Sequence, residues 1–182
     1  MKIRISTIIG IVFLIISVGF GVWLYHSKGG FNEVEIEERG AHEYTLFGKE
    51  YDGSIKDEGF EKIFADLEKA LKKYDSSKYI MVFYEHFPDK DSEFKTRAVI
   101  GVVSNQTTKK LFEGDWGFHN VKIDQSIYGV QQAGAMVTSV YSDIADYAEK
   151  HQLKLSKTGM IEHYYSSEKF GVEIPFSPKT DQ

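Results

Sequence analysis

The sequence predicts an α+β domain made of two pseudo-symmetric repeats, each running strand, helix, strand, strand, with one transmembrane helix before them. Three observations predict this: a long apolar run near the N-terminus, alternating apolar and polar residues typical of strands, and two segments with helical periodicity. The chain has 182 residues, of which 42% are hydrophobic. That is enough for one compact domain with a short appendage.

The appendage is the apolar run of residues 5–25, ISTIIGIVFLIISVGFGVWLY, which contains no charged residue. A helix of about 20 such residues crosses a bilayer. Lys2 and Arg4 precede the run, and Trp23 and Tyr25 stand where interfacial aromatic residues belong. We therefore expect a transmembrane helix that anchors the chain in the cell membrane as a single-pass protein.

The charges on either side of this run indicate its orientation. Residues 1–4 are basic, whereas the chain turns acidic after Lys28, at Glu33, Glu35 and Glu37. Because basic flanks stay on the cytoplasmic side, we expect the N-terminus in the cytoplasm and the domain on the extracytoplasmic side. A cleaved signal peptide is the rival interpretation, which the length of the run and the lack of a clear small-x-small cleavage site disfavour.

The rest of the chain divides into a linker, a folded domain and a tail. The linker is residues 26–30, HSKGG, whose paired glycines carry little side-chain restraint. The domain is expected over residues 31–176, with repeats at about 31–104 and 118–176, and residues 177–182 form the tail.

The first repeat places one amphipathic helix between strands. Val34 and Ile36 alternate with glutamates, as in a strand with one solvated face. A helix is predicted over residues 59–74, where apolar residues recur at helical spacing and lysines gather in the last turn. Two strands are predicted after it, at residues 78–87 and 96–104.

The same order returns after a predicted linker at residues 105–120. A strand and turn are predicted over residues 121–134, a helix over 135–152, and two strands at 160–166 and 170–176. Each half alone buries little apolar surface, so we expect the two halves to pack side by side.

Composition excludes several kinds of site. The chain contains no cysteine, so a disulfide framework, a thiolate metal site and a cysteine nucleophile are excluded. The net charge of −5 and the lack of a basic stripe disfavour a nucleic-acid partner. The six histidines are isolated in the sequence and no glycine-rich nucleotide motif is present, so we expect neither a metal nor a cofactor.

One glutamate, Glu162, stands inside a run that otherwise has the composition of a sheet core. In the predicted strand it shares a face with Tyr164. Aligning the two halves places Tyr164 with Tyr84 and Glu162 with Val82. The carboxylate therefore breaks the internal symmetry, which indicates a cleft that is apolar on one wall and anionic on the other.

Such a cleft would attract an amphipathic cation. Burial desolvates the Glu162 carboxylate, so an incoming ammonium group gains electrostatic attraction there. Aromatic faces from Tyr84, Tyr128, Tyr164 and Trp116 would add cation–π attraction of about 0.5 to 2 kcal/mol each. The alternative interpretation is a strand glutamate that faces water beside a surface tyrosine.

An ordered set of residues in the second half matches a known family. They are Tyr128 and Val130 at the end of a strand, Gly134 in a turn, Glu162 and Tyr164 in the next strand, and Ile174 and Pro175 in the last one. With these residues the chain resembles the GyrI-like (gyrase-inhibitor-like) domain, the effector-binding domain of AraC-type and MerR-type multidrug regulators. The first half matches more weakly, at Tyr84, Pro88 and Arg97.

The resemblance covers about residues 31–176 and implies a two-repeat fold. It also implies a cleft for small, lipophilic or cationic molecules, with Glu162 inside it. Some GyrI-like proteins hydrolyse strained electrophiles such as cyclopropane-bearing toxins, so the resemblance also permits Glu162 as a general base, with Tyr84 or Tyr128 orienting the substrate. No helix-turn-helix precedes the domain, so direct DNA binding is not expected.

We therefore expect a membrane-anchored protein that captures a lipophilic small molecule, with a preference for cations, in the cleft between the repeats. Two alternatives stay open. One is a hydrolase that uses Glu162 as its base, and the other is a protein-interaction module whose cleft takes a partner's loop.

Overall fold

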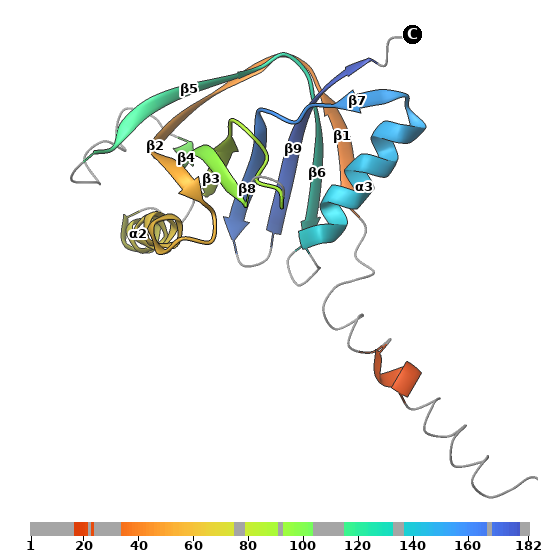
Figure 1. Ribbon diagram of the computed structural model, residues 1–182, viewed down its shortest axis with the longest axis horizontal. Helices are drawn as coiled ribbons and strands as arrows, with labels where there is room; N and C mark the ends of the chain where they lie inside the picture. Colours follow the sequence, from red (N-terminus) through yellow and green to blue (C-terminus); the bar gives the residue numbers. More distant parts are fainter. Residues whose placement is uncertain are drawn as a thin grey trace, which may run out of the picture.

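The computed structural model describes residues 17–21, 23, 34–74, 79–90, 93–103, 115–132, 137–166 and 169–178 (Figure 1). Most of the predicted membrane segment, residues 5–25, lies outside these ranges, as do residues 1–4 and 26–30. The part of it that is described, residues 17–21 and 23, is helical. No helix within the described ranges combines the length and the apolar character needed to span a membrane.

The elements follow the predicted order twice. The first repeat is β2 (His42–Ser54), α2 (Glu58–Tyr74), β3 (Ile80–Tyr84) and β4 (Lys95–Val103), and the second is β6 (Ser126–Gln132), α3 (Val137–Lys150), β8 (Met160–Ser166) and β9 (Lys169–Pro178). The predicted α+β class and both predicted helices are confirmed.

Three further strands accompany the repeats: β1 (Glu35–Arg39), β5 (Gly117–Ile123) and β7 (Leu153–Leu155). β5 starts earlier than the strand predicted from residue 121, and β7 was not predicted. β9 continues to Pro178, which lies inside the predicted tail.

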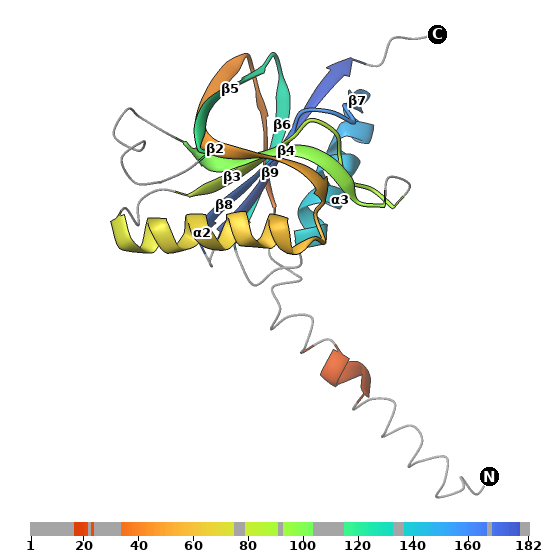
Figure 2. The ribbon, with the colours of Figure 1, turned by 60° about the vertical axis from the view of Figure 1, so that its left-hand side comes forward.

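The strands form one antiparallel sheet in the order β1-β6-β9-β8-β3-β4-β2-β5, with β7 paired to β9. β1 leads into β2 and β5 leads into β6, so the β1–β6 and β2–β5 ladders are consecutive parts of the same two bent segments. The sheet is therefore strongly curved. Figure 1 and Figure 2 show β2 and β5 arching away from the rest of the sheet.

Both helices cover the same face of the sheet. α2 contacts β2, β3 and β4, whereas α3 contacts β6, β7 and β9. Ile63 and Leu67 of α2 and Ile144 of α3 belong to one hydrophobic core with Val82 and Val172 of the sheet. In α2, glutamates in the first turn and lysines in the last complement the helix dipole.

The other face of the sheet carries a smaller core under the arch. It consists of the buried residues Leu46, Met81, Val99, Val121, Ile123 and Ile161. These residues come from β2, β3, β4, β5 and β8, so the arching strands cover this face as the helices cover the first.

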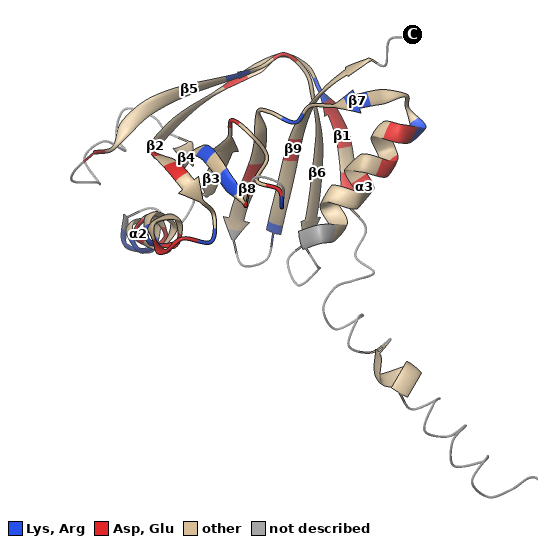
Figure 3. Cartoon of the chain, viewed as in Figure 1, with Lys and Arg blue, Asp and Glu red and all other residues tan. Residues whose placement is uncertain are grey.

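At the end of the sheet, β1 carries acidic side chains along most of its length, as the red colouring of Figure 3 shows. Such charges are typical of edge strands and discourage pairing with another chain.

A pair of glycines lets β2 and β4 approach closely. Gly48 and Gly101 are partners in the β2–β4 ladder. A Cβ on Gly48 would lie 2.6 Å from the carbonyl oxygen of Ile100, and one on Gly101 would lie 2.7 Å from the Cα of Gly48. Because these neighbours are backbone atoms, they cannot move aside without distorting the ladder.

We expect Gly48→Ala to lower the free energy of unfolding by about 1 to 3 kcal/mol, the usual cost of overpacking. Gly40→Ala is the matched control, since nothing lies within 4 Å of a Cβ there. Urea denaturation of both variants measures the difference. Equal midpoints would contradict the close approach of β2 and β4.

Candidate ligand-binding site

Glu162 lies at the centre of the sheet, where the two repeats meet. The β3–β8 ladder pairs Ile80–Tyr84 with Met160–Tyr164, and its middle pair is Val82 and Glu162. Val82 and Met160 belong to the core under the helices, so the alternation of side chains puts Glu162 on the helix-covered face. The residue is only 9% exposed.

Three tyrosine hydroxyls donate hydrogen bonds to the Glu162 carboxylate. Tyr84 and Tyr164 both reach Oε2 at 2.7 Å, and Tyr141 of α3 reaches Oε1. Burial raises the pKa of all three tyrosines, and the negative charge of Glu162 raises it further. The hydroxyls therefore stay protonated and act as donors.

Aromatic rings surround this carboxylate. Phe64 of α2 packs edge-on against Tyr164, with ring centres 4.8 Å apart, and Phe87 lies 5.9 Å from Tyr141. In the part of the chain that the structure describes, no lysine, arginine or histidine forms an ion pair with Glu162. Among the described residues, neutral phenol groups solvate its charge.

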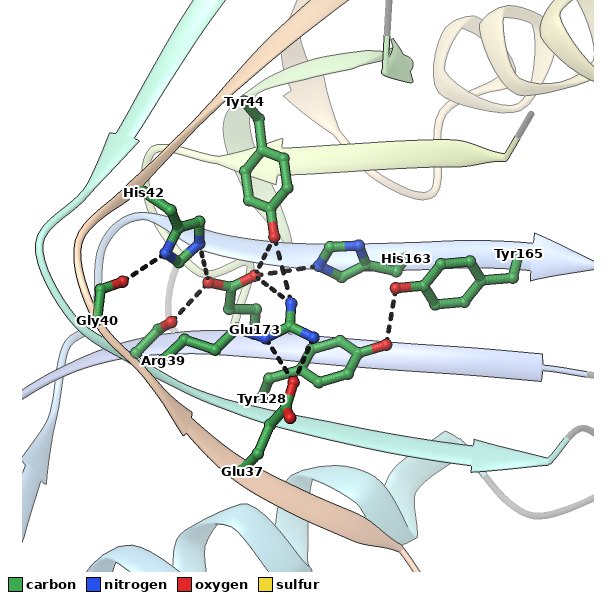
Figure 4. Close-up of polar contacts among 10 residues, drawn as sticks. Glu37, Arg39, Gly40, His42, Tyr44, Tyr128, His163, Tyr165 and Glu173 are labelled. Carbon is green, nitrogen blue, oxygen red and sulfur yellow. Dashed lines mark hydrogen bonds and ion pairs between the residues drawn. The ribbon is translucent and has the colours of Figure 1, made fainter. Parts of the chain in front are cut away.

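A second buried carboxylate, Glu173 of β9, lies on the opposite face of the sheet. Unlike Glu162, it lies beside an arginine and two histidines (Figure 4). Its Oε1 accepts from Ser126 at 2.6 Å and faces His42 Nε2 at 2.7 Å. Its Oε2 accepts from Tyr44 at 2.9 Å, and Arg39 and His163 lie 3.5 and 3.3 Å from it. These contacts come from β1, β2, β6 and β8.

The contacts of Glu173 balance its charge. Burial acts to raise the pKa of this carboxyl, but the contacts from His163, Ser126 and Tyr44 outweigh it and lower the pKa to about 2. His42 directs Nδ1 at the Gly40 carbonyl oxygen, 2.6 Å away, and Nε2 at Glu173. His42 thus lies between the Gly40 carbonyl group and the Glu173 carboxylate.

The structure brings some of the predicted site residues together and separates others. Tyr84 and Tyr164 join Glu162 as expected. Tyr128 lies on the Glu173 face, since it is the ladder partner of Glu173, and its hydroxyl hydrogen-bonds Tyr165 at 2.7 Å. Trp116 stacks on Phe47 with ring centres 6.4 Å apart, and it lines a separate cavity of about 520 Å³ beside α2.

Tyr141 of α3 belongs to the site, although its place in the sequence is typical of a core residue. Its helical spacing with Val137, Val140 and Ile144 is that of an apolar face, and its ring does pack against the core. Only the hydroxyl reaches Glu162. A tyrosine, rather than a phenylalanine, at this buried position is the one signal in the sequence that pointed to a polar partner.

Comparisons with known proteins identify the fold of this chain. No protein-family model and no curated protein matches the sequence. Among solved structures, the C-terminal domain of EcmrR is 12% identical, with a TM-score of 0.54 over 81% of this chain and 98% of that domain. The fold is that of the GyrI-like effector-binding domains.

A hydrolase encoded by lin2189 from Listeria innocua is similar to the same extent. It is 11% identical, with a TM-score of 0.55 over 79% of this chain and 92% of the other. SAV2435, solved bound to tetraphenylphosphonium, is 12% identical over 80% of this chain and 94% of the other, with a TM-score of 0.42. At that score the likeness supports no inference about this chain, whereas the first two establish the GyrI-like fold.

The lowered pKa of Glu173 predicts a loss of stability in acid. A carboxyl whose pKa falls from 4.5 to about 2 on folding stabilises the folded state above pH 4.5, and this contribution disappears as the pH falls toward 2. Its size at neutral pH is about 3 kcal/mol. We therefore expect Glu173→Gln to be less stable by about 3 kcal/mol at pH 7 and to approach the parent chain near pH 2.

Urea unfolding of both proteins between pH 7 and 2 measures this difference. The pKa of His163 is lowered by burial, which also destabilises the folded state as the pH falls, but it acts from pH 6.5 downward. The exposed Glu68→Gln is the control and should follow the parent chain. A constant difference between Glu173→Gln and the parent from pH 4.5 to 2 would contradict the assignment.

Proposed function

We propose that this protein is a membrane-anchored small-molecule-binding protein that captures a lipophilic, cationic molecule at Glu162, where the two repeats meet. One observation carries the proposal. The Glu162 carboxylate is buried, and in the described chain it has three neutral hydrogen-bond donors and no cationic partner.

A buried carboxylate with only neutral partners retains its attraction for a positive charge. At about 5 Å and an effective dielectric constant of about 20, that attraction is about 3 kcal/mol. A strongly hydrated ammonium or metal ion would lose its water on entering, which offsets the gain. A cation whose charge is spread over an apolar body loses less, so the site favours lipophilic cations.

The aromatic side chains favour the same class of ligand. Tyr84, Tyr141 and Tyr164 present rings around the carboxylate, and Phe64 and Phe87 extend the aromatic surface toward the two helices. Phe87 is 41% exposed, so part of this surface is reachable from solvent. Each ring that faces a bound cation contributes about 0.5 to 2 kcal/mol.

The GyrI-like fold supports a small-molecule partner, whereas the membrane anchor rests on the composition of residues 5–25 alone. Their lack of charge and their flanking residues favour a single pass with the domain on the extracytoplasmic side. A reporter enzyme fused after Gln182 tests this part, and activity of a cytoplasm-specific reporter would contradict the orientation.

Hydrolysis with Glu162 as general base is less favoured by the geometry. Both carboxylate oxygens accept hydrogen bonds from tyrosines, so fewer lone pairs remain to accept a proton from water. No second carboxyl or histidine in the described chain pairs with Glu162 as an acid and base partner. The Glu162→Gln variant tests both cation binding and this hydrolase alternative.

We expect the full-length protein in detergent micelles to bind tetraphenylphosphonium, and Glu162→Gln to bind it about 10- to 100-fold more weakly, as the loss of one close charge predicts. Isothermal titration calorimetry measures both affinities. Triphenylphosphine oxide, a neutral molecule of similar shape, should bind the two proteins alike. Glu68→Gln on the exposed side of α2 is the matched charge control.

Three outcomes would count against capture of a cation at Glu162. Equal affinities in the parent and in Glu162→Gln would place any binding elsewhere. Turnover of a cyclopropane-bearing electrophile that disappears in Glu162→Gln would favour the hydrolase. A stoichiometric protein partner, with neither binding nor turnover, would favour the interaction module.

A further inference from the structure

A second cavity, of about 350 Å³, lies on the face of the sheet opposite Glu162. Its charged and polar lining residues come from β1, β6, β8 and β9, and they are Glu35, Glu37, Arg39, Tyr128, Tyr165 and Lys169. The volume lies within the range of small-molecule pockets. The cation proposed for Glu162 makes no use of this cavity.

Internal contacts hold the floor of the cavity in place. The Arg39 guanidinium lies 3.5 Å from the centre of the Tyr128 ring. Its Nε and Nη2 atoms donate to Glu37 Oε1 at 2.7 and 2.5 Å, so the charges of Arg39 and Glu37 offset each other. Tyr128 is 4% exposed, and its hydroxyl bonds that of Tyr165 (Figure 4).

Gly171 makes room for this floor. A Cβ at this position would lie 2.8 Å from the Tyr128 hydroxyl, so any larger residue would displace the ring. Tyr79 is a further hydrogen-bond partner of Tyr165, so three hydroxyls form a chain from Tyr79 through Tyr165 to Tyr128. With Tyr165 donating to Tyr128, the Tyr128 hydroxyl keeps its own proton for a further partner. The floor therefore offers a hydrogen-bond donor to a molecule in the cavity.

Two opposite charges stand on the walls of the cavity. Within the described ranges, neither Glu35 nor Lys169 forms an ion pair, and Lys169 Nζ lies over the Tyr165 ring, 5.3 Å from its centre. Glu35 is the ladder partner of Val130, and Val130 is that of Gly171. From strand geometry, the Cα atoms of Glu35 and Lys169 are about 12 Å apart.

This arrangement suits a ligand that itself carries both charges. A simple anion near Lys169 would also meet the carboxylate of Glu35, and a simple cation near Glu35 would also meet Lys169. A molecule with an ammonium and a carboxylate satisfies both walls. Val130 adds an apolar surface beside them.

We propose that this cavity binds a free α-amino acid with an apolar side chain. Its ammonium group contacts Glu35, and its carboxylate accepts from Lys169 and from the Tyr128 hydroxyl. The side chain lies toward Val130. The site is thus chemically distinct from Glu162, which has one net charge and aromatic walls.

L-Leucine is the probe, with the full-length protein in detergent micelles and calorimetric titration as the measurement. We expect L-leucine to bind, and N-acetyl-L-leucine and L-leucinamide, which each lack one charge, to bind at least about tenfold more weakly. Glu35→Gln and Lys169→Gln should each reduce the affinity for L-leucine by the same factor. Both residues are exposed, so neither variant is expected to affect folding.

The double variant Glu35→Lys with Lys169→Glu exchanges the two charges and should recover part of the lost affinity. Glu43→Gln and Lys154→Gln, also exposed, are the matched controls and should leave L-leucine binding unchanged. Absence of L-leucine binding, equal binding of the two capped derivatives, or full affinity in both single variants would each overturn the proposal. Tetraphenylphosphonium binding to Lys169→Gln shows separately whether the Glu162 site is intact.

Discussion

The antiparallel ladder between β3 and β8 is the interaction on which the rest of this structure depends. It joins the two repeats at the middle of the sheet, with Val82 and Glu162 as its central pair. Tyr84 and Tyr164 each stand two residues beyond that pair, on opposite sides of it. Their hydroxyls can therefore converge on one carboxylate oxygen from both directions. The interface between the halves thus creates the candidate site.

The same ladder also divides the two faces of the sheet. Because side chains alternate along β8, Glu162 faces the helices while His163 faces Glu173 under the arch. Each face then buries one carboxylate. Glu173 is surrounded by Arg39, His42 and His163, and its charge serves to hold β1, β2 and β8 around β9. Glu162 is surrounded by neutral hydroxyls, so its charge remains available to a ligand. Burial alone would not have distinguished the two, whereas the charge of their partners does.

Local patterns in the sequence predicted the features that depend on local chemistry. The apolar spacing in α2 and α3 and the alternation in β8 were enough to give both helices and the face of Glu162. The internal alignment of the two repeats matched Tyr84 with Tyr164, and both hydroxyls contact Glu162. Residue positions that depend on the pairing of strands far apart in the sequence could not be predicted from local patterns. Tyr128 was assigned to the Glu162 cleft, but its face follows from the register of β6 against β9, which no local pattern contains. Glu173 drew no attention, since Arg39, His42 and Tyr44 lie more than a hundred residues before it. β5, with a glycine and polar residues at its start, is held in the sheet chiefly by pairing with β2.

Arg39 connects the two polar regions under the arch. One side of its guanidinium faces Glu173 and Tyr44, the other faces Glu37, and its plane covers Tyr128 at the floor of the second cavity. The position of the Tyr128 ring therefore depends on the same cation that balances Glu173. Among the residues that the structure describes, the Glu162 cluster shares no side-chain contact with Arg39, and the backbone of β8 and its neighbours links the two faces. A side chain that moves under the arch can reach Glu162 only by shifting β8 itself, and the pairing of β8 with β3 on one side and β9 on the other resists that shift. The two regions are thus structurally independent of each other, although they share one strand.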